Sequence, residues 1–554
     1  MIKDYRDLMV WQKGRKLAVE VYQLTKPFPK SERKRSLSTK LVISIFLLFT
    51  ALFTNIAYAN NIQMSSVELK NLTLGEPTAD IEFDISWDNS WRYGDTFYDA
   101  AWVFVKYSVN DTAWQHATIS GTTSIGSGTG LSIDVPLDNK GAFLYRSSAD
   151  SGTLSTTNVQ LQWNRQADGV AYNAAKIEIR VFAIEMVYIA RGPFYVGDTD
   201  NDNTNCFFRA DGTYVKDEAL GPYQITSEDA ITVGTADGNL YYDVDNDYSG
   251  DQSGPIPAGF PKGYNTFYIM KYEISQGQYS DFLNTLTQAE QNARTYDTLT
   301  AEDAAGHYVM IEQDITSVTY RQAIKAGADP VDGQPYWFGC DLDGDGILNE
   351  ANDGQWIACG SLTVMDGMAY ADWAALRPMT ELEFEKAARG PSAVVDDEYV
   401  WRNSTVESAT SVLTNAGEAG ETANQGNLNY SSCSPDGPYR CGIYADSASS
   451  RQNAGASFYG VMELSGSLWE RPVTVGNATG RGFTGTHGDG VLSSGSANNS
   501  DWPGYGVGAN GSGLRGGQYE LGPELTRILD RYYAAHTRTN RYYTYGGRCV
   551  RTSP

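Results

Sequence analysis

Residues 513–551 read GLRGGQYELGPELTRILDRYYAAHTRTNRYYTYGGRCVR. The stretch opens on GLRGG, closes on RCVR, and between these ends mixes tyrosine and arginine with short polar side chains. A tyrosine offers a large amphipathic contact at low entropic cost, so this composition is typical of a recognition surface. Tyrosine is also common in half-buried strands, and that interpretation competes for each position.

The length and composition of the chain point to a multidomain globular protein. Its 554 residues are too many for one ordinary hydrophobic core, so two or three domains are expected. The content of 41% hydrophobic and 12% aromatic residues excludes a wholly disordered or fibrous chain. A net charge of −25 disfavours nucleic acid and anionic membranes as partners.

Residues 34–59 have the layout of a secretory signal. Basic residues precede an apolar run from Leu41 to Thr54, and Ala57-Tyr58-Ala59 supplies a small-residue cleavage site. The alternative is an uncleaved anchor, but the charge-free stretch is barely long enough to span a bilayer. We expect cleavage after Ala59, no stable membrane insertion, and a secreted, cell-surface or periplasmic product.

Residues 1–33 carry the motif YRDLMVWQK…VYQLTKPFP, with apolar residues at helical spacing. The motif resembles the first helix of the four-helix-bundle proteins linked to ribosomal RNA intervening sequences. Only one such helix is present, so the bundle cannot form from it. We interpret residues 1–33 as a fused helical fragment without a function here.

Residues 60–185 show a period of two between apolar and polar side chains. The first such run has the apolar residues Ile81, Phe83, Ile85 and Trp87. A second run covers residues 177–181, and turn-rich segments separate the runs. This pattern predicts an antiparallel, β-sandwich-like domain at residues 60–185.

From residue 186 onward, short helices are expected among long loops rich in Gly, Asn and Ser. Ser275 and Gln278 form a capping-box pattern ahead of an apolar face, and Thr380 and Glu383 form another. The fold of residues 186–554 is therefore predicted to be α+β and shaped by its loops, which need ties to hold them.

A family resemblance covers this second part. The motifs are FYIMKYEISQGQYSDFLN (267–284), LRPMTELEFEKAARG (376–390), FYGVMELSGSLWE (458–470), LRGGQY (514–519) and GGRCVR (546–551). In this order they resemble the signatures of the formylglycine-generating enzyme, or sulfatase-modifying factor, domain family. The resemblance implies a C-type-lectin-like fold for residues 186–554.

The resemblance implies an oxidase only if the catalytic cysteines are present. In that family a cysteine pair placed shortly after the RGG motif binds copper. Residues 518–531 hold no cysteine, and the matching positions fall near Leu521 and Thr526. Neither side chain replaces a thiolate ligand, so we predict a protein that is not an enzyme. A formylglycine-generating oxidase and a structural envelope protein are the alternatives.

Another branch of the same fold, the variable proteins of diversity-generating retroelements, resembles the C-terminal stretch more closely. In that branch the residues between RGG and the closing motif form a rewritable ligand-binding surface. Residues 513–551 are then the variable region, and the partner is a protein or glycan. The candidate ligand-binding residues are Tyr519, Leu521, Leu525, Tyr532, Tyr533, His536, Arg538, Asn540, Tyr542, Tyr543, Thr544 and Tyr545.

Residues 341–353 contain a candidate calcium loop. Oxygen ligands recur at alternate positions, with glycine at the sixth position for a sharp turn, as hard-oxygen coordination requires. The candidate ligands are Asp341, Asp343, Asp345, Ile347 through its carbonyl, Asn349 and Asp353. The family resemblance adds Glu470 in SGSLWE, although Ser467 stands where asparagine is usual. We expect calcium to be structural; a solvated acidic turn is the alternative.

Six cysteines all follow the predicted signal, and their even number allows disulfides in an exported protein. The local pairs Cys340 with Cys359 and Cys433 with Cys441 are favoured. Spacing alone does not fix the connectivity, and free buried thiols are the alternative.

Overall fold

The structure is a computed structural model. It describes residues 61–554 except 122–123, 126–129, 175, 200–204, 213–220, 243–247, 297–304, 312–315, 329–332, 408–411, 432, 447 and 505–507. The predicted helical fragment and signal segment lie outside the described residues. Those that are described belong to one compact unit, Ala57–Pro554. Within them, no helix is long and apolar enough to cross a membrane.

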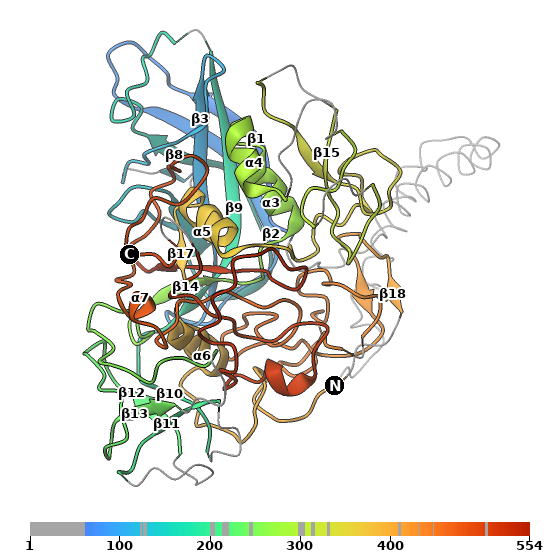
Figure 1. Ribbon diagram of the computed structural model, residues 1–554. Helices are drawn as coiled ribbons and strands as arrows, with labels where there is room; N and C mark the ends of the chain where they lie inside the picture. The colour runs from blue at the N-terminus through green and yellow to red at the C-terminus, as the bar shows by residue number, and fades with distance from the viewer. Residues whose placement is uncertain are drawn as a thin grey trace, which may run out of the picture. The chain divides into compact units, whose positions relative to one another are not determined.

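The described residues form mostly antiparallel β-structure with a few short helices (Figure 1). The elements are β1 (Gln63–Lys70), β2 (Ala79–Arg92), β3 (Asp99–Val109), β4 (Gln115–His116), β5 (Ser124–Ile125), β6 (Leu131–Asp134), β7 (Ala142–Arg146), β8 (Asp150–Trp163), β9 (Ile177–Ile189), β10 (Phe194–Val196), β11 (Phe207–Arg209), β12 (Tyr223–Ile225), β13 (Leu240–Tyr242), β14 (Phe267–Met270), α3 (Gln276–Leu283), α4 (Gln288–Arg294), β15 (Ile324–Ala326), β16 (Phe338–Cys340), α5 (Val364–Trp373), β17 (Arg377–Pro378), α6 (Glu381–Arg389), β18 (Leu413–Thr414), β19 (Thr422–Ala423), α7 (Ala478–Arg481), the 3-10 turn η2 (Pro523–Thr526) and β20 (Cys549–Thr552).

Two sheets pack face to face in the N-terminal part. One has the order β1-β2-β8-β5, and the larger has the order β17-β20-β14-β9-β3-β7-β6 with β4 attached to β3. The alternating residues of β2 are buried as expected, with Phe83 and Trp87 at 0% and 1% exposure. They share one hydrophobic cluster with Val103 and Val105 of β3, so the apolar period of two defines the inner face of a sandwich.

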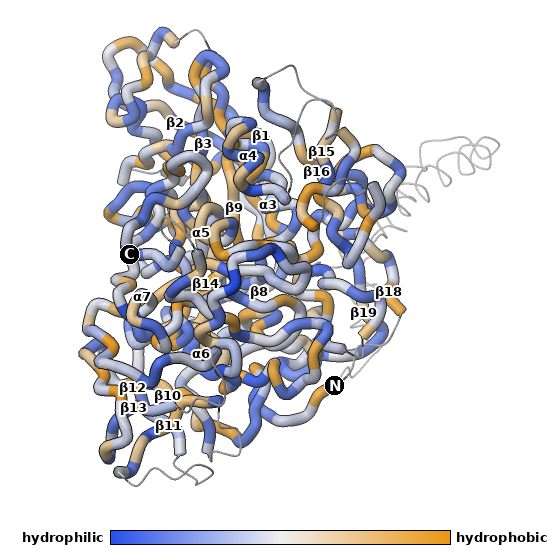
Figure 2. Tube along the Cα trace, in the orientation of Figure 1, coloured by the Kyte–Doolittle hydropathy of each residue, from blue (hydrophilic) through white to orange (hydrophobic). Residues whose placement is uncertain are grey.

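The larger sheet joins the N-terminal part to the rest of the chain. β9 pairs with β3 along one edge and with β14 along the other, so the expected boundary at 185/186 falls inside a strand. The opposite face of β3 packs on the second part: Trp102 Nε1 donates to the Ala374 carbonyl at 2.8 Å, and Phe104 contacts Trp373 of α5 at 5.0 Å between ring centroids. The tube is hydrophobic along β9 (Figure 2).

The two capping boxes predicted from sequence are present. Ser275 and Gln278 cap α3, and Thr380 and Glu383 cap α6, each through both reciprocal hydrogen bonds. The same device begins α4 and α5. Side-chain caps thus set the start of each of these short helices.

The favoured disulfide pairs are not formed in this structure. All six cysteines are buried thiols. Burial raises the pKa of each thiol whose shift is resolved, including Cys359 and Cys441. These side chains therefore act as small core residues, which is the alternative that the sequence left open.

Candidate ligand-binding face

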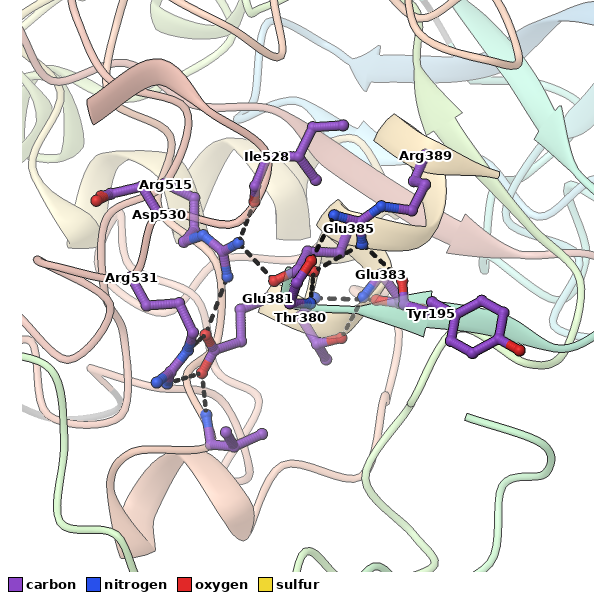
Figure 3. A network of polar contacts seen from close by, with 12 residues as sticks. Tyr195, Thr380, Glu381, Glu383, Glu385, Arg389, Arg515, Ile528, Asp530 and Arg531 are labelled. Carbon is purple, nitrogen blue, oxygen red and sulfur yellow. Dashed lines mark hydrogen bonds and ion pairs between the residues drawn. The ribbon is translucent and has the colours of Figure 1, made fainter. Parts of the chain in front are cut away.

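Arginines of the C-terminal stretch are tied to carboxylates on α6 (Figure 3). Glu381 accepts from Arg515 Nη1 at 3.1 Å and from Arg531 Nε at 2.7 Å, and Glu385 accepts from Arg515 Nη2 at 2.8 Å. The side chains in these ion pairs are 0% exposed. Charge-assisted bonds of this kind are short and directional, so they fix where the stretch starts and turns.

The later part of the stretch is held in the same way. Arg541 pairs with Asp366 of α5, and its Nη2 donates to the Thr295 carbonyl at 3.0 Å. Arg548 Nε lies 2.9 and 3.0 Å from the two carboxylate oxygens of Glu470. The predicted calcium ligand Glu470 thus has its carboxylate buried against a guanidinium.

The turn after Arg515 requires glycine. Gly516 and Gly517 have φ values of +89° and +74°, which L side chains rarely adopt. A Cβ at Gly517 would also lie 2.4 Å from the Thr526 side chain. The RGG motif thus lets the chain reverse closely against η2.

We define the C-terminal face as residues 532–545 together with the residues that they contact. Its outermost predicted residues are Arg538, Asn540 and Tyr542, which are exposed. Half-buried are Leu521, Leu525, Tyr532, Tyr533 and Tyr543; buried are Tyr519, His536, Thr544 and Tyr545. As ligand contacts these residues stay predictions, and Tyr519 lies in a separate hydrophobic cluster with Tyr272 and Leu468.

Aromatic rings run continuously across the face. Tyr533 lies 5.5 Å from Trp469 and 5.5 Å from His536 between ring centroids, and Tyr542 lies 4.3 Å from Tyr543 and 5.5 Å from Tyr545. Two members come from far upstream in the sequence. Tyr320 stacks on Tyr543 at 3.9 Å, and Tyr248 contacts His536 at 4.9 Å. No local sequence signal marked these two tyrosines, because only the fold brings their loops to this face.

One of the two positions that match the family's cysteines, Leu521, lies beside this face. Leu521 packs against the cluster of Trp469, Leu514 and Tyr545. Thr526 is buried in η2, and its hydroxyl donates to the Pro523 carbonyl at 2.7 Å. Neither side chain offers a soft ligand for copper.

The candidate calcium loop follows β16. Carboxylate oxygens of Asp341, Asp343 and Asp345 all lie within 4.8 Å of one another. Asp341 Oδ1 accepts from the Gly344 amide at 2.9 Å, which closes the tight turn. The ammonium of Lys325 on β15 also pairs with Asp341, so one positive charge already faces the loop.

The remaining predicted ligands of the loop divide into two kinds. Asn349 Oδ1 accepts from the Cys340 amide at 2.9 Å, so its side chain holds the turn. Asp353 is buried, and its Oδ1 has no partner among the described residues. Burial raises the pKa of Asp353, and the charges of Asp343 and Asp341 raise it further. An unpartnered buried carboxylate oxygen on the same acidic loop is a hard ligand of the kind that a divalent cation takes.

A known protein family matches this region of the chain. The sequence pattern of the sulfatase-modifying factor enzyme 1-like domain family matches residues 178–553. The match spans about two thirds of the chain and begins inside β9, so the chain belongs to this family. No curated protein shows a significant match to the chain.

Proposed function

We propose that this chain is an exported, non-enzymatic binding protein that presents the C-terminal face to a protein or glycan ligand. The observation that carries the proposal is the aromatic and arginine-bearing face on a buried ionic frame, next to Leu521 and Thr526 where the family's oxidase holds thiols. Tyrosine and arginine dominate recognition energy at interfaces. The groups that reach the ligand are Tyr532, Tyr533, Arg538, Asn540, Tyr542 and Tyr543.

The scaffold of this binding protein is proposed to be C-type-lectin-like, and the C-terminal stretch to be the variable region of a diversity-generating retroelement. The exposed residues 537–540 stand between arginines that are held by buried carboxylates, which supports this proposal. A surface whose residues are rewritten needs a scaffold whose stability does not depend on those residues. Sequencing the locus tests it. A reverse-transcriptase gene with a near-copy of the last hundred or so bases, differing at adenines, is expected.

Calcium is proposed as a structural ion held by Asp341, Asp343, Asp345, the Ile347 carbonyl and Asp353. When bound, the ion would neutralise these carboxylates and tie the loop after β16. The Lys325 ammonium pairs with Asp341 and therefore competes with the calcium ion for this carboxylate.

A binding experiment tests the main proposal. The purified protein is applied to glycan and protein arrays beside a variant carrying Tyr532→Ser, Arg538→Ser and Tyr542→Ser. We expect specific capture of the wild type and at least a tenfold loss of binding for the variant. The two proteins should have the same melting temperature. Equal capture by the two proteins would move the binding site away from the C-terminal face.

A catalytic experiment tests the rival function, which family membership favours. A sulfatase-type cysteine peptide is incubated with the protein, copper and oxygen, and mass spectrometry reads formylglycine. We expect no turnover above a metal-only blank. A double variant, Leu521→Cys with Thr526→Cys, is the matched control and should gain copper(I) binding. Turnover by the wild type would assign the chain to the oxidases.

A further inference from the structure

Arg471 differs from every other buried arginine of the described residues. Its side chain is 7% exposed, and Nε, Nη1 and Nη2 are each shielded without a hydrogen-bond partner in that part of the chain. The other buried arginines bond carboxylates or carbonyls; Arg440, for example, donates to the Glu421 carbonyl at 2.7 Å. Burial lowers the pKa of Arg471 to about 10, so the guanidinium is charged at neutral pH.

The surroundings of Arg471 belong to the C-terminal face. Its guanidinium carbon lies 4.3 Å from the centroid of the Tyr545 ring. His536 is adjacent, and its Nδ1 is buried without a partner among the described residues. Burial and the charges of Arg471 and Arg538 lower the pKa of His536 to about 4. The ring is therefore neutral at pH 7 and offers a donor or an acceptor.

The carboxylate next to Arg471 in the chain and the one that holds Arg515 and Arg531 are already paired. Glu470 is bound by Arg548, and Glu381 is bound by Arg515 and Arg531. Buried polar groups in native proteins are nearly always paired, and a buried unpaired charge is strongly destabilising. No carboxylate of the described residues pairs with Arg471, so its charge leaves room for an anion of the ligand.

We propose that Arg471 is the anchor of an anion subsite that takes a single carboxylate of the ligand, between Tyr545 and His536. The inference rests on the proposed binding function of this face. A guanidinium matches a carboxylate through two parallel hydrogen bonds. The net charge of −25 repels polyanions, so one isolated carboxylate fits better than a phosphate or sulfate chain.

The exposed turn at residues 537–540 is the way in. Arg538 lies on this turn, and its side chain is exposed. An entering carboxylate gains Arg538 as a second cation. The subsite thus closes over the anion from the surface side.

Thermal denaturation at pH 7 and constant ionic strength tests the proposal with sodium acetate and sodium D-glucuronate against sodium chloride. We expect a saturable, carboxylate-specific rise in the melting temperature of the wild type. Arg471→Met removes the rise and stabilises the protein in chloride, whereas Arg538→Gln weakens the response several-fold. The exposed pair-forming Arg209 supplies a matched control, Arg209→Gln, which keeps the full response.

Two results would overturn the subsite: no carboxylate-specific rise in the wild type, or an equal rise in Arg471→Met. If that variant fails to fold, nitrogen-15 spectra of the arginine side chains decide the matter, because the Arg471 Nε–H signal must shift with acetate in the wild type. If carboxylates raise the melting temperature but the arrays capture the wild type and the face variant equally, the subsite stands and the proposed function is rejected. Array capture that depends on the face without any carboxylate response rejects the subsite alone.

Discussion

At the scale of single residues, exposure separates the supports of the C-terminal face from its contact groups. Tyr545 is 5% exposed and lies against Trp469 and Arg471, whereas Tyr542 is 38% exposed. The sequence predicted both as ligand contacts, because a run of tyrosines carries no signal of which rings turn inward. Burial, and not residue type, decides which side chains are free to change.

We expect Tyr542→Ser to change the free energy of unfolding by less than ~0.5 kcal/mol, as exposed substitutions usually do. Tyr545→Ser should lower it by about 3 kcal/mol, because truncating a buried ring leaves a cavity. Urea denaturation of both variants measures the difference. Equal losses for the two variants would place Tyr542 in the core and contradict this division.

Breaking the buried ionic frame should cost far more than breaking a surface pair. Arg515→Met leaves Glu381 and Glu385 short of a partner, and we expect a loss of about 3–5 kcal/mol in unfolding free energy. The exposed pair Arg209 and Asp237 gives the control Arg209→Met, for which less than ~1 kcal/mol is expected. Similar losses for both would mean that the frame is solvated.

Glu463 predicts a pH dependence of stability. Its Oε1 accepts from the Gly442 amide at 2.6 Å, and its Oε2 is buried without a partner among the described residues. Burial raises the pKa of Glu463 from 4.5 to about 7. The folded carboxyl therefore holds its proton at a higher pH than the unfolded one, so this group weakens folding increasingly as pH rises from about 4.5 to 7.

Glu463→Gln should remove this penalty. We expect the variant to exceed the wild type in unfolding free energy by ~1–3 kcal/mol at pH 8 and to approach it near pH 4.5. Denaturation curves at both pH values, with the exposed Glu418→Gln as control, measure the effect. A pH-independent difference would show that the carboxyl stays ionised in the folded protein.

At the scale of elements, the sequence was informative where one local rule sufficed. The alternation at residues 81–87 predicted β2, and the boxes at Ser275 and Thr380 predicted α3 and α6. The sequence did not predict contacts that depend on tertiary packing. The loops of Tyr248 and Tyr320 reach the C-terminal face only through such packing. Arg471 also escaped notice, because its unpaired state appears only once all its neighbours are placed.

The β15–β16 hairpin predicts how calcium binding responds to charge. Lys325→Met removes the ammonium that competes for Asp341, so calcium affinity should rise several-fold, and the variant should melt below the wild type in EDTA because Asp341 loses its partner. Calorimetry and melting curves with EDTA or calcium read both effects. A variant with Asp343→Asn and Asp345→Asn should lose the response; calcium-independent melting of all three proteins would reject the site.

At the scale of the whole molecule, the shared sheet argues that the sandwich and the family region fold together. A fragment of residues 186–554 lacks most of β9 and all of β3, which uncovers Trp373 and leaves residues 186–189 of β9 without their partners on β3. We expect this fragment to aggregate or to lose near-ultraviolet circular dichroism, whereas residues 61–554 fold. A well-folded fragment with a cooperative transition would instead support two independent domains.

The pinned arginines have a consequence for how this surface evolves. Four arginines of the stretch each pair with a carboxylate of fixed position: Arg515, Arg531, Arg541 and Arg548. The distances between these carboxylates therefore set the number of residues between consecutive arginines. An inserted or deleted residue would move one of these arginines away from its carboxylate. A side-chain replacement between two of the arginines would not. Related sequences should therefore differ in the side chains between these arginines. The number of residues between the arginines should stay constant.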